Sequence, residues 1–152
     1  MDRVIKFRGK YIKDGDWIYG GYGYLKKSKK HFITNQRAFF GVFPETVGQF
    51  TGFKDIDGKE IFEGDILQYV DHPDEKAKYV KMLDGSWVIG NKVFDDLATA
   101  LIFADFKVIG NIHDNPELLK GSKTQEVNKT SSDNPAIFAE DFEDDDDLPS
   151  YI

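Results

Sequence analysis

The last nine residues of this 152-residue chain have the side chains best suited to specific binding. An unbroken acidic run is followed by apolar and aromatic residues, and the candidate binding residues are Asp144, Asp145, Asp146, Asp147, Leu148, Pro149, Tyr151 and Ile152. Carboxylates attract a basic rim on another protein, and bulky side chains behind them can anchor a peptide in a small pocket. We predict that these residues bind a partner protein.

The same segment resembles the C-terminal tip of bacterial single-stranded DNA-binding proteins, which ends in Asp residues followed by Leu or Ile, Pro and Phe. Residues 145–149, Asp-Asp-Asp-Leu-Pro, match that pattern. The resemblance implies a docking peptide for enzymes of replication and repair. This chain departs from the pattern at Ser150, which replaces the anchoring Phe, and continues to Tyr151 and Ile152.

The charge of the chain is concentrated in its C-terminal segment. Residues 121–152 contain two lysines and nine carboxylates, so they account for the whole formal charge of −7. An acidic segment of this kind can also serve only to keep the protein in solution, or it can act within its own chain. The aromatic and aliphatic residues of the tip keep the binding interpretation open beside the solubilising one, because a purely solubilising segment gains nothing from them.

A second candidate site is a run of lysines near the N-terminus. The lysines lie next to Tyr22, Tyr24, His31 and Phe32, and they are Lys26, Lys27, Lys29 and Lys30. Lysines neutralise phosphates and aromatic rings stack on bases, so this loop is a candidate nucleic-acid contact that the acidic tail would mask and regulate. Lysines also protect the tip of a hairpin from aggregation, and the neutral charge of residues 1–120 favours that interpretation.

Other kinds of chemistry find no support in the sequence. There is no cysteine, so disulfides, thiolate metal sites and a Cys nucleophile are excluded. The three histidines are far apart, and residues 55–60 have Glu60 where a calcium loop requires glycine. We expect no metal, no cofactor and no enzymatic activity. An enzyme or ligand-sequestering protein whose pocket is invisible in the sequence remains a third class.

The elements that position these residues are expected to be strands. Aromatic residues make up 14% of the chain and suit the pleated surface of a sheet. Three Asp-Gly pairs between apolar stretches, at residues 14–15, 57–58 and 84–85, predict hairpins, because Asp-Gly adopts the positive φ angles of a type I′ turn. Gly20, Gly21 and Gly23 predict a strand with a bulge or close packing.

Further elements follow the second hairpin. Gly64-Asp65-Ile66 resembles the corner of small SH3-like barrels, where glycine lets the chain turn into an apolar strand. Residues 92–104 fit a short helix or a strand, and residues 106–110 a strand. Asn115 and Pro116 predict the cap and first turn of a short helix.

These features predict a mainly β protein of two parts. Residues 1–120 form a body of small antiparallel sheets, for which two lobes with one SH3-like barrel are one compatible arrangement. Residues 121–152 form a disordered linker and acidic tail, because residues 121–135 contain only one strong apolar residue, Val127. No stretch is long and apolar enough to be a membrane helix or a signal peptide, so we expect a cytoplasmic location.

Three blocks of sequence, at residues 5–10, 44–69 and 108–119, together resemble the YopX family of bacteriophage and prophage proteins. The resemblance runs over about residues 3–119 and implies a phage accessory protein inside a bacterial host. We expect it to bind a host or phage protein, as in counter-defence or as a decoy of single-stranded-DNA machinery. Self-association is compatible with the aromatic-rich body, but no residue specifies it.

Overall fold

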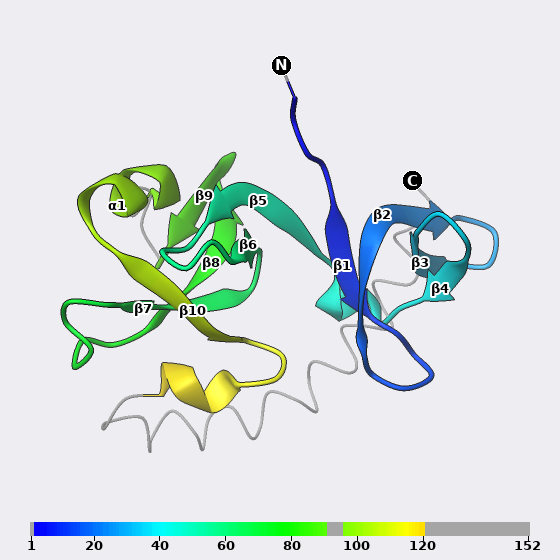
Figure 1. The fold of residues 1–152 in the computed structure, drawn as a ribbon. Helices are drawn as coiled ribbons and strands as arrows, with labels where there is room; N and C mark the ends of the chain where they lie inside the picture. Colours follow the sequence, from blue (N-terminus) through cyan, green and yellow to red (C-terminus); the bar gives the residue numbers. More distant parts are fainter. Residues whose placement is uncertain (1, 91–95, 121–152) are drawn as a thin grey trace.

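The computed structural model describes residues 2–90 and 96–120, in which ten strands form two antiparallel sheets (Figure 1). The N-terminal sheet has the strand order β4-β3-β2-β1-β5-β6, with β1 (Phe7–Lys10), β2 (Trp17–Leu25), β3 (Lys30–Thr34), β4 (Phe39–Gly41), β5 (Gly48–Lys54) and β6 (Glu60–Phe62). The C-terminal sheet has the order β10-β7-β8-β9, with β7 (Asp65–Tyr69), β8 (Lys78–Leu83), β9 (Ser86–Ile89) and β10 (Phe106–Asn111). The mainly β prediction is confirmed.

Three short helices complete the described chain: η1 (Pro44–Thr46), α1 (Leu97–Phe103) and η2 (Pro116–Leu119). The predicted segment 92–104 is therefore helical where the structure describes it, and Asp96 caps α1 by accepting the Thr99 N–H. The helix after Asn115 is a 3₁₀ turn. Asn115 is its cap residue and Pro116 opens its first turn, as predicted, although the Asn115 amide oxygen accepts the N–H of Asn111 and makes no capping hydrogen bond.

All three Asp-Gly hairpins are present, but only the third has the expected type I′ conformation. Asp84 and Gly85 both have positive φ, at 52° and 84°, between β8 and β9. At the first two pairs only the glycine has positive φ. The Asp55 carboxylate explains the second turn, because it accepts the N–H groups of residues 57 and 59 and so closes a wider loop.

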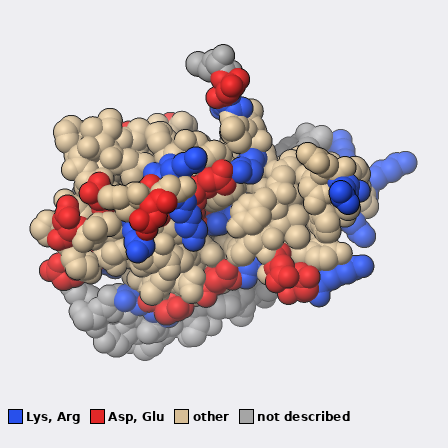
Figure 2. All heavy atoms as spheres, in the orientation of Figure 1, with Lys and Arg blue, Asp and Glu red and all other residues tan. Residues whose placement is uncertain are grey.

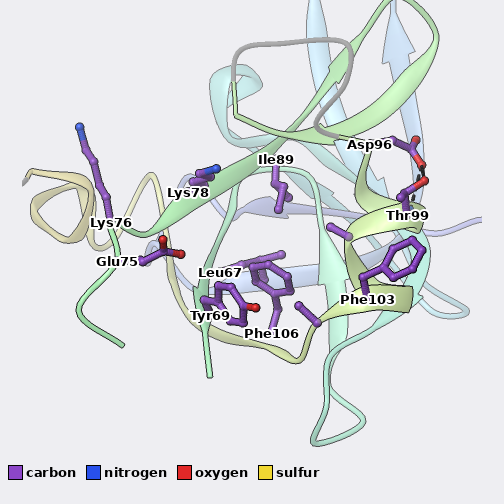
Figure 3. A pocket seen from close by; sticks show the side chains of 12 residues that line it. Leu67, Tyr69, Glu75, Lys76, Lys78, Ile89, Asp96, Thr99, Phe103 and Phe106 are labelled. Atoms are coloured by element: carbon purple, nitrogen blue, oxygen red, sulfur yellow. Dashed lines mark hydrogen bonds between the residues drawn. The ribbon is translucent and has the colours of Figure 1, made fainter. Parts of the chain in front are cut away.

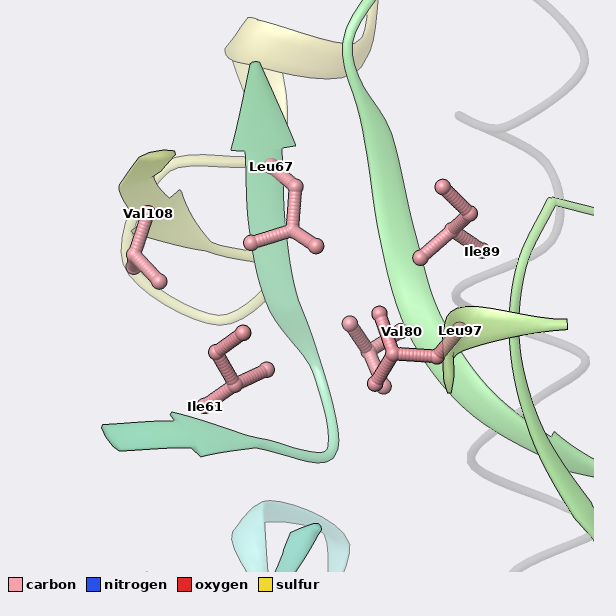
Figure 4. Packing of buried hydrophobic residues seen from close by; sticks show 6 residues of the cluster. All are labelled: Ile61, Leu67, Val80, Ile89, Leu97 and Val108. Atoms are coloured by element: carbon pink, nitrogen blue, oxygen red, sulfur yellow. The ribbon is translucent and has the colours of Figure 1, made fainter. Parts of the chain in front are cut away.

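One hydrophobic cluster connects the C-terminal sheet to the edge of the N-terminal sheet. It is built from β6, the four strands of the C-terminal sheet and α1, and its buried members are Ile61, Leu67, Val80, Ile89, Leu97 and Val108 (Figure 4). Gly64, with φ of 92°, turns the chain from β6 into β7 and so passes it from one sheet to the other. The predicted corner is confirmed, whereas the likeness to an SH3-like barrel stays a prediction.

Glycines allow β2 and β3 to lie unusually close together. A Cβ atom on Gly20 would lie 2.1 Å from the backbone oxygen of Thr34, whereas one on Gly21 would come no closer to any atom than 3.4 Å, from the Thr34 methyl group. The predicted close packing is therefore confirmed at Gly20.

We expect Gly20→Ala to lower the free energy of unfolding by about 1–3 kcal/mol, because the new methyl group must push a backbone carbonyl aside. Gly21→Ala, in the same strand, serves as the matched control. Urea unfolding of both variants measures the effect. Equal stability of the two variants would contradict the assignment of close packing to Gly20.

Candidate protein-binding site

The acidic tip predicted to bind a partner lies outside the described residues, as does the predicted linker. The body, in contrast, contains the predicted lysine loop, a polar junction between the sheets and a groove beside α1. Among the described residues, no helix is both long and apolar enough to cross a membrane.

The lysine loop is the tip of the hairpin between β2 and β3. All four lysines are exposed, and Lys29 has a positive φ of 58°. Basic side chains project from the end of the molecule that contains β2, β3 and β4 (Figure 2). The structure therefore brings the four predicted lysines together on the surface.

A polar pair lies behind this loop. The Tyr22 hydroxyl and the Nδ1 atom of His31 are 2.6 Å apart, and the Tyr24 ring packs on the His31 ring at 4.6 Å between centroids. Partial burial raises the pKa of Tyr22 and lowers the pKa of His31. Both side chains are therefore mainly uncharged at neutral pH, so they add no charge to the loop.

A buried ion pair lies where the two sheets meet. Arg8 of β1 donates to the Asp65 carboxylate of β7 at 2.9 Å, and the two side chains are only 6% and 3% exposed. The guanidinium lies over the rings of Trp17 and Phe62, at 4.4 and 5.0 Å from the centroids. Burial raises the pKa of Asp65, although the charge of Arg8 and the N–H of Phe62 act against this rise.

A second ion pair, between Lys10 and Asp114, lies at the outer end of this junction. The Asp114 carboxylate accepts hydrogen bonds from Lys10 Nζ, Trp17 Nε1 and Asn111 Nδ2. Burial alone would raise the pKa of Asp114, but these donors outweigh it and lower the pKa to about 2. The His113 ring packs on Trp17 at 5.9 Å between centroids.

These polar groups are engaged with one another. The junction draws residues from all three of the sequence blocks named above, which lie far apart in the chain. Its carboxylates already accept donors from Arg8, Lys10, Trp17 and the backbone. We therefore interpret the junction as the connection that fixes one sheet against the other, a role that the sequence did not reveal.

The junction makes stability depend on pH through His113. Burial lowers the pKa of His113 most, and the positive charges of Arg8 and Lys10 lower it further. The unfolded chain therefore takes up this proton at a higher pH than the folded chain, so stability falls as pH drops through the ordinary histidine value of about 6.5. We expect His113→Gln to weaken this loss between pH 7 and 5, measured by urea unfolding. An unchanged pH profile would contradict it.

The groove beside α1 is a hollow of about 320 Å³ between the helix and the C-terminal sheet (Figure 3). Leu67 and Ile89 of the core form its floor, and the stacked rings of Tyr69 and Phe106 form one wall. We call it the α1 groove, lined by Leu67, Tyr69, Glu75, Lys76, Lys78, Ile89, Asp96, Thr99, Ala100, Phe103, Ala104 and Phe106. Its floor is apolar and its rim carries charges of both signs.

Two large apolar side chains of α1 are exposed, Phe103 in the lining of this groove and Ile102 beside it in the sequence. Ile102 is 76% exposed and Phe103 is 81% exposed. They point outward because Leu97, Ala100 and Leu101 occupy the face of the helix that packs on the core. The sequence contained this signal, since a helix with that apolar face leaves residues 102 and 103 on the opposite side, but the prediction did not use it.

An adjacent pair of exposed apolar side chains beside a hollow is typical of a protein-binding surface, whereas single ones are ordinary. Among residues 2–90 and 96–120, no cluster of His, Asp and Glu is placed to hold a metal ion. The α1 groove with Ile102 and Phe103 is therefore the candidate site on the body.

Comparison with known proteins agrees with the fold. A family model described as YopX protein matches residues 6–120. The crystal structure of protein EF1440 from Enterococcus faecalis is similar, with a TM-score of 0.52 and 26% sequence identity over 78% of this chain and 100% of that chain. No curated protein matches the chain.

Proposed function

This chain belongs to the YopX family, and on that premise we propose that it is a phage accessory protein that acts by binding a bacterial host protein or another phage protein. The observation that supports this most is the exposure of Ile102 and Phe103 beside the α1 groove. Their position gives the body an apolar surface that the core of the chain does not use.

The groove suggests what the partner presents. An apolar side chain would insert over Leu67 and Ile89, and the Phe103 ring would cover it from the side of the helix. Carboxylates next to that anchor would pair with Lys76 and Lys78 on the opposite rim. The proposed partner therefore carries an aromatic or aliphatic anchor flanked by acidic residues.

The acidic tip, residues 144–152, is proposed as a second, separable contact. Its likeness to the tip of single-stranded DNA-binding proteins supports a role as a recruiter or a decoy of enzymes that handle single-stranded DNA. In the cytoplasm of an infected bacterium, either contact would let the protein alter host machinery or block a defence component.

Affinity capture from nuclease-treated bacterial lysate separates the two contacts. Full-length protein and residues 1–120 are compared as baits, with partners identified by mass spectrometry. The proposal predicts that residues 1–120 retain the partners of the groove and lose those of the tip. Loss of every partner on truncation would remove the body from the proposal.

The exposed lysine loop supports an alternative of a different class, binding to nucleic acid. The four lysines, engaged on single-stranded DNA, would give a log–log salt slope with a magnitude of about 3. Under this alternative, changing all four to Ser abolishes binding, and deleting residues 121–152 strengthens it by unmasking the loop. Binding that is absent at low salt, with or without the tail, would exclude it.

A further inference from the structure

The N-terminal arm, residues 2–6, continues β1 beyond both of its neighbouring strands and projects away from the body (Figure 1). β1 pairs with β2 and β5 only from Phe7 onward, and Phe50 N–H donates to the Lys6 carbonyl. Within the described chain, no backbone hydrogen bond joins residues 2–5 to another segment. The arm is therefore an extended segment with two open edges.

The arm exposes apolar residues that are more stable when another strand covers them. Val4 and Ile5 are both 59% exposed, and in an extended chain these neighbours point to opposite faces. β-branched residues with unpaired backbone groups readily pair with another strand. The arm lines two hollows. Asp2, Arg3 and Val4 line one of about 510 Å³ together with residues of β5, and Ile5 and Lys6 line the other together with residues of β2.

The sequence of the arm matches itself when two copies run antiparallel. With Val4 on the two-fold axis, Val4 faces Val4, Arg3 faces Ile5, and Asp2 faces Lys6 of the other copy. Opposite charges then face each other at both ends of the pairing. Lys6 donates to Glu60 at 2.8 Å, and its ammonium group has further donors for the second carboxylate.

We propose that two copies of this chain form a symmetric dimer by antiparallel pairing of residues 2–6. The pairing uses the edge of the arm that faces away from β5, because on the β5 side the Lys6 carbonyl already accepts the Phe50 N–H. The two-fold symmetry closes the pairing, so it produces a dimer and does not continue into a chain of many copies. The candidate site beside α1 takes no part in it.

Single cysteines test the register, because the natural chain contains none. Val4→Cys places two thiols opposite each other, within the range that a disulfide spans, and oxidation should link most of the protein into covalent dimers. Ile5→Cys separates the thiols by the longer diagonal of the pairing, and Ile102→Cys lies on α1. Both controls should cross-link at least tenfold less. Equal cross-linking of the three variants would overturn the proposal.

Light scattering after size exclusion, with any affinity tag at the C-terminus, tests the assembly itself. The full chain should be a dimer, and deletion of residues 2–5 should give a folded monomer, because the arm contributes nothing to the core. Asp2→Lys should weaken dimerisation by about tenfold, since like charges then meet at two symmetric positions. Asp71→Lys makes the same charge change elsewhere and should have no effect. A monomeric full chain, or a dimer without the arm, would overturn the proposal.

Discussion

Arg8→Met is expected to lower the free energy of unfolding by about 3–5 kcal/mol. The substitution keeps an unbranched side chain over Trp17 and Phe62 but removes the charge that pairs with Asp65. Asp65 is only 2% exposed, so its carboxylate would then be buried without a counter-ion. Urea unfolding followed by circular dichroism measures the change.

The double variant Arg8→Met, Asp65→Asn provides the control. An amide oxygen at residue 65 still accepts the Phe62 N–H, as the carboxylate does at 2.7 Å, but carries no charge. We expect the double variant to recover a large part of the lost stability. A loss below about 1 kcal/mol in the single variant would show that the junction does not hold the sheets together.

The single variant should also show a distinctive response to pH. Burial already raises the pKa of Asp65, and loss of the Arg8 charge would raise it further. The folded protein then binds this proton at a higher pH than the unfolded chain, so stability increases as pH falls through the raised folded pKa toward the ordinary, unfolded value. The deficit of Arg8→Met should therefore shrink on acidification. If the loss of stability in Arg8→Met does not change with pH, the cause is lost packing on the Trp17 and Phe62 rings and not the missing charge.

The double substitution Ile102→Ser, Phe103→Ser is expected to weaken binding of the partner by roughly 30-fold or more. Truncation of a single apolar anchor at the centre of an interface costs about 2 kcal/mol or more, which is a factor of roughly 30 in affinity. Both side chains are exposed, so the free energy of unfolding should change by no more than about 0.5 kcal/mol. Titration calorimetry with the purified partner measures the affinity.

Phe39→Ser is the matched control for this pair. Phe39 is 74% exposed, but it lies on β4, in the other sheet. Its loss removes an exposed ring comparable to that of Phe103 without touching α1. If the α1 variant binds with unchanged affinity, or if the control loses as much affinity, the partner does not bind through the proposed surface.

Local sequence was sufficient for the three Asp-Gly hairpins of this fold. The apolar stretches around three Asp-Gly pairs predicted hairpins that are all present, because turn and strand preferences are properties of neighbouring residues. The turn types were less predictable. At the second hairpin the Asp55 carboxylate also accepts the N–H of Val108 at 2.9 Å, a long-range contact that local rules do not contain.

The junction and the groove depend on such long-range contacts. Arg8 and Asp65 lie more than fifty residues apart, and no spacing rule links them. The exposure of Phe103 follows from the apolar face of the helix, but the groove beside it is formed with strands that are distant in the sequence. The acidic tip and the lysine loop stood out in the sequence because charge runs are visible without a fold, and their roles stay predictions.

The central claim is that the body binds a protein through the surface beside α1. The most direct measurement is quantitative capture from nuclease-treated bacterial lysate, comparing full-length protein with its Ile102→Ser, Phe103→Ser variant. The account predicts at least one partner that the full-length protein retains, that Phe39→Ser retains equally, and that the α1 variant loses. Identical sets of partners, in equal amounts for all three baits, would contradict it.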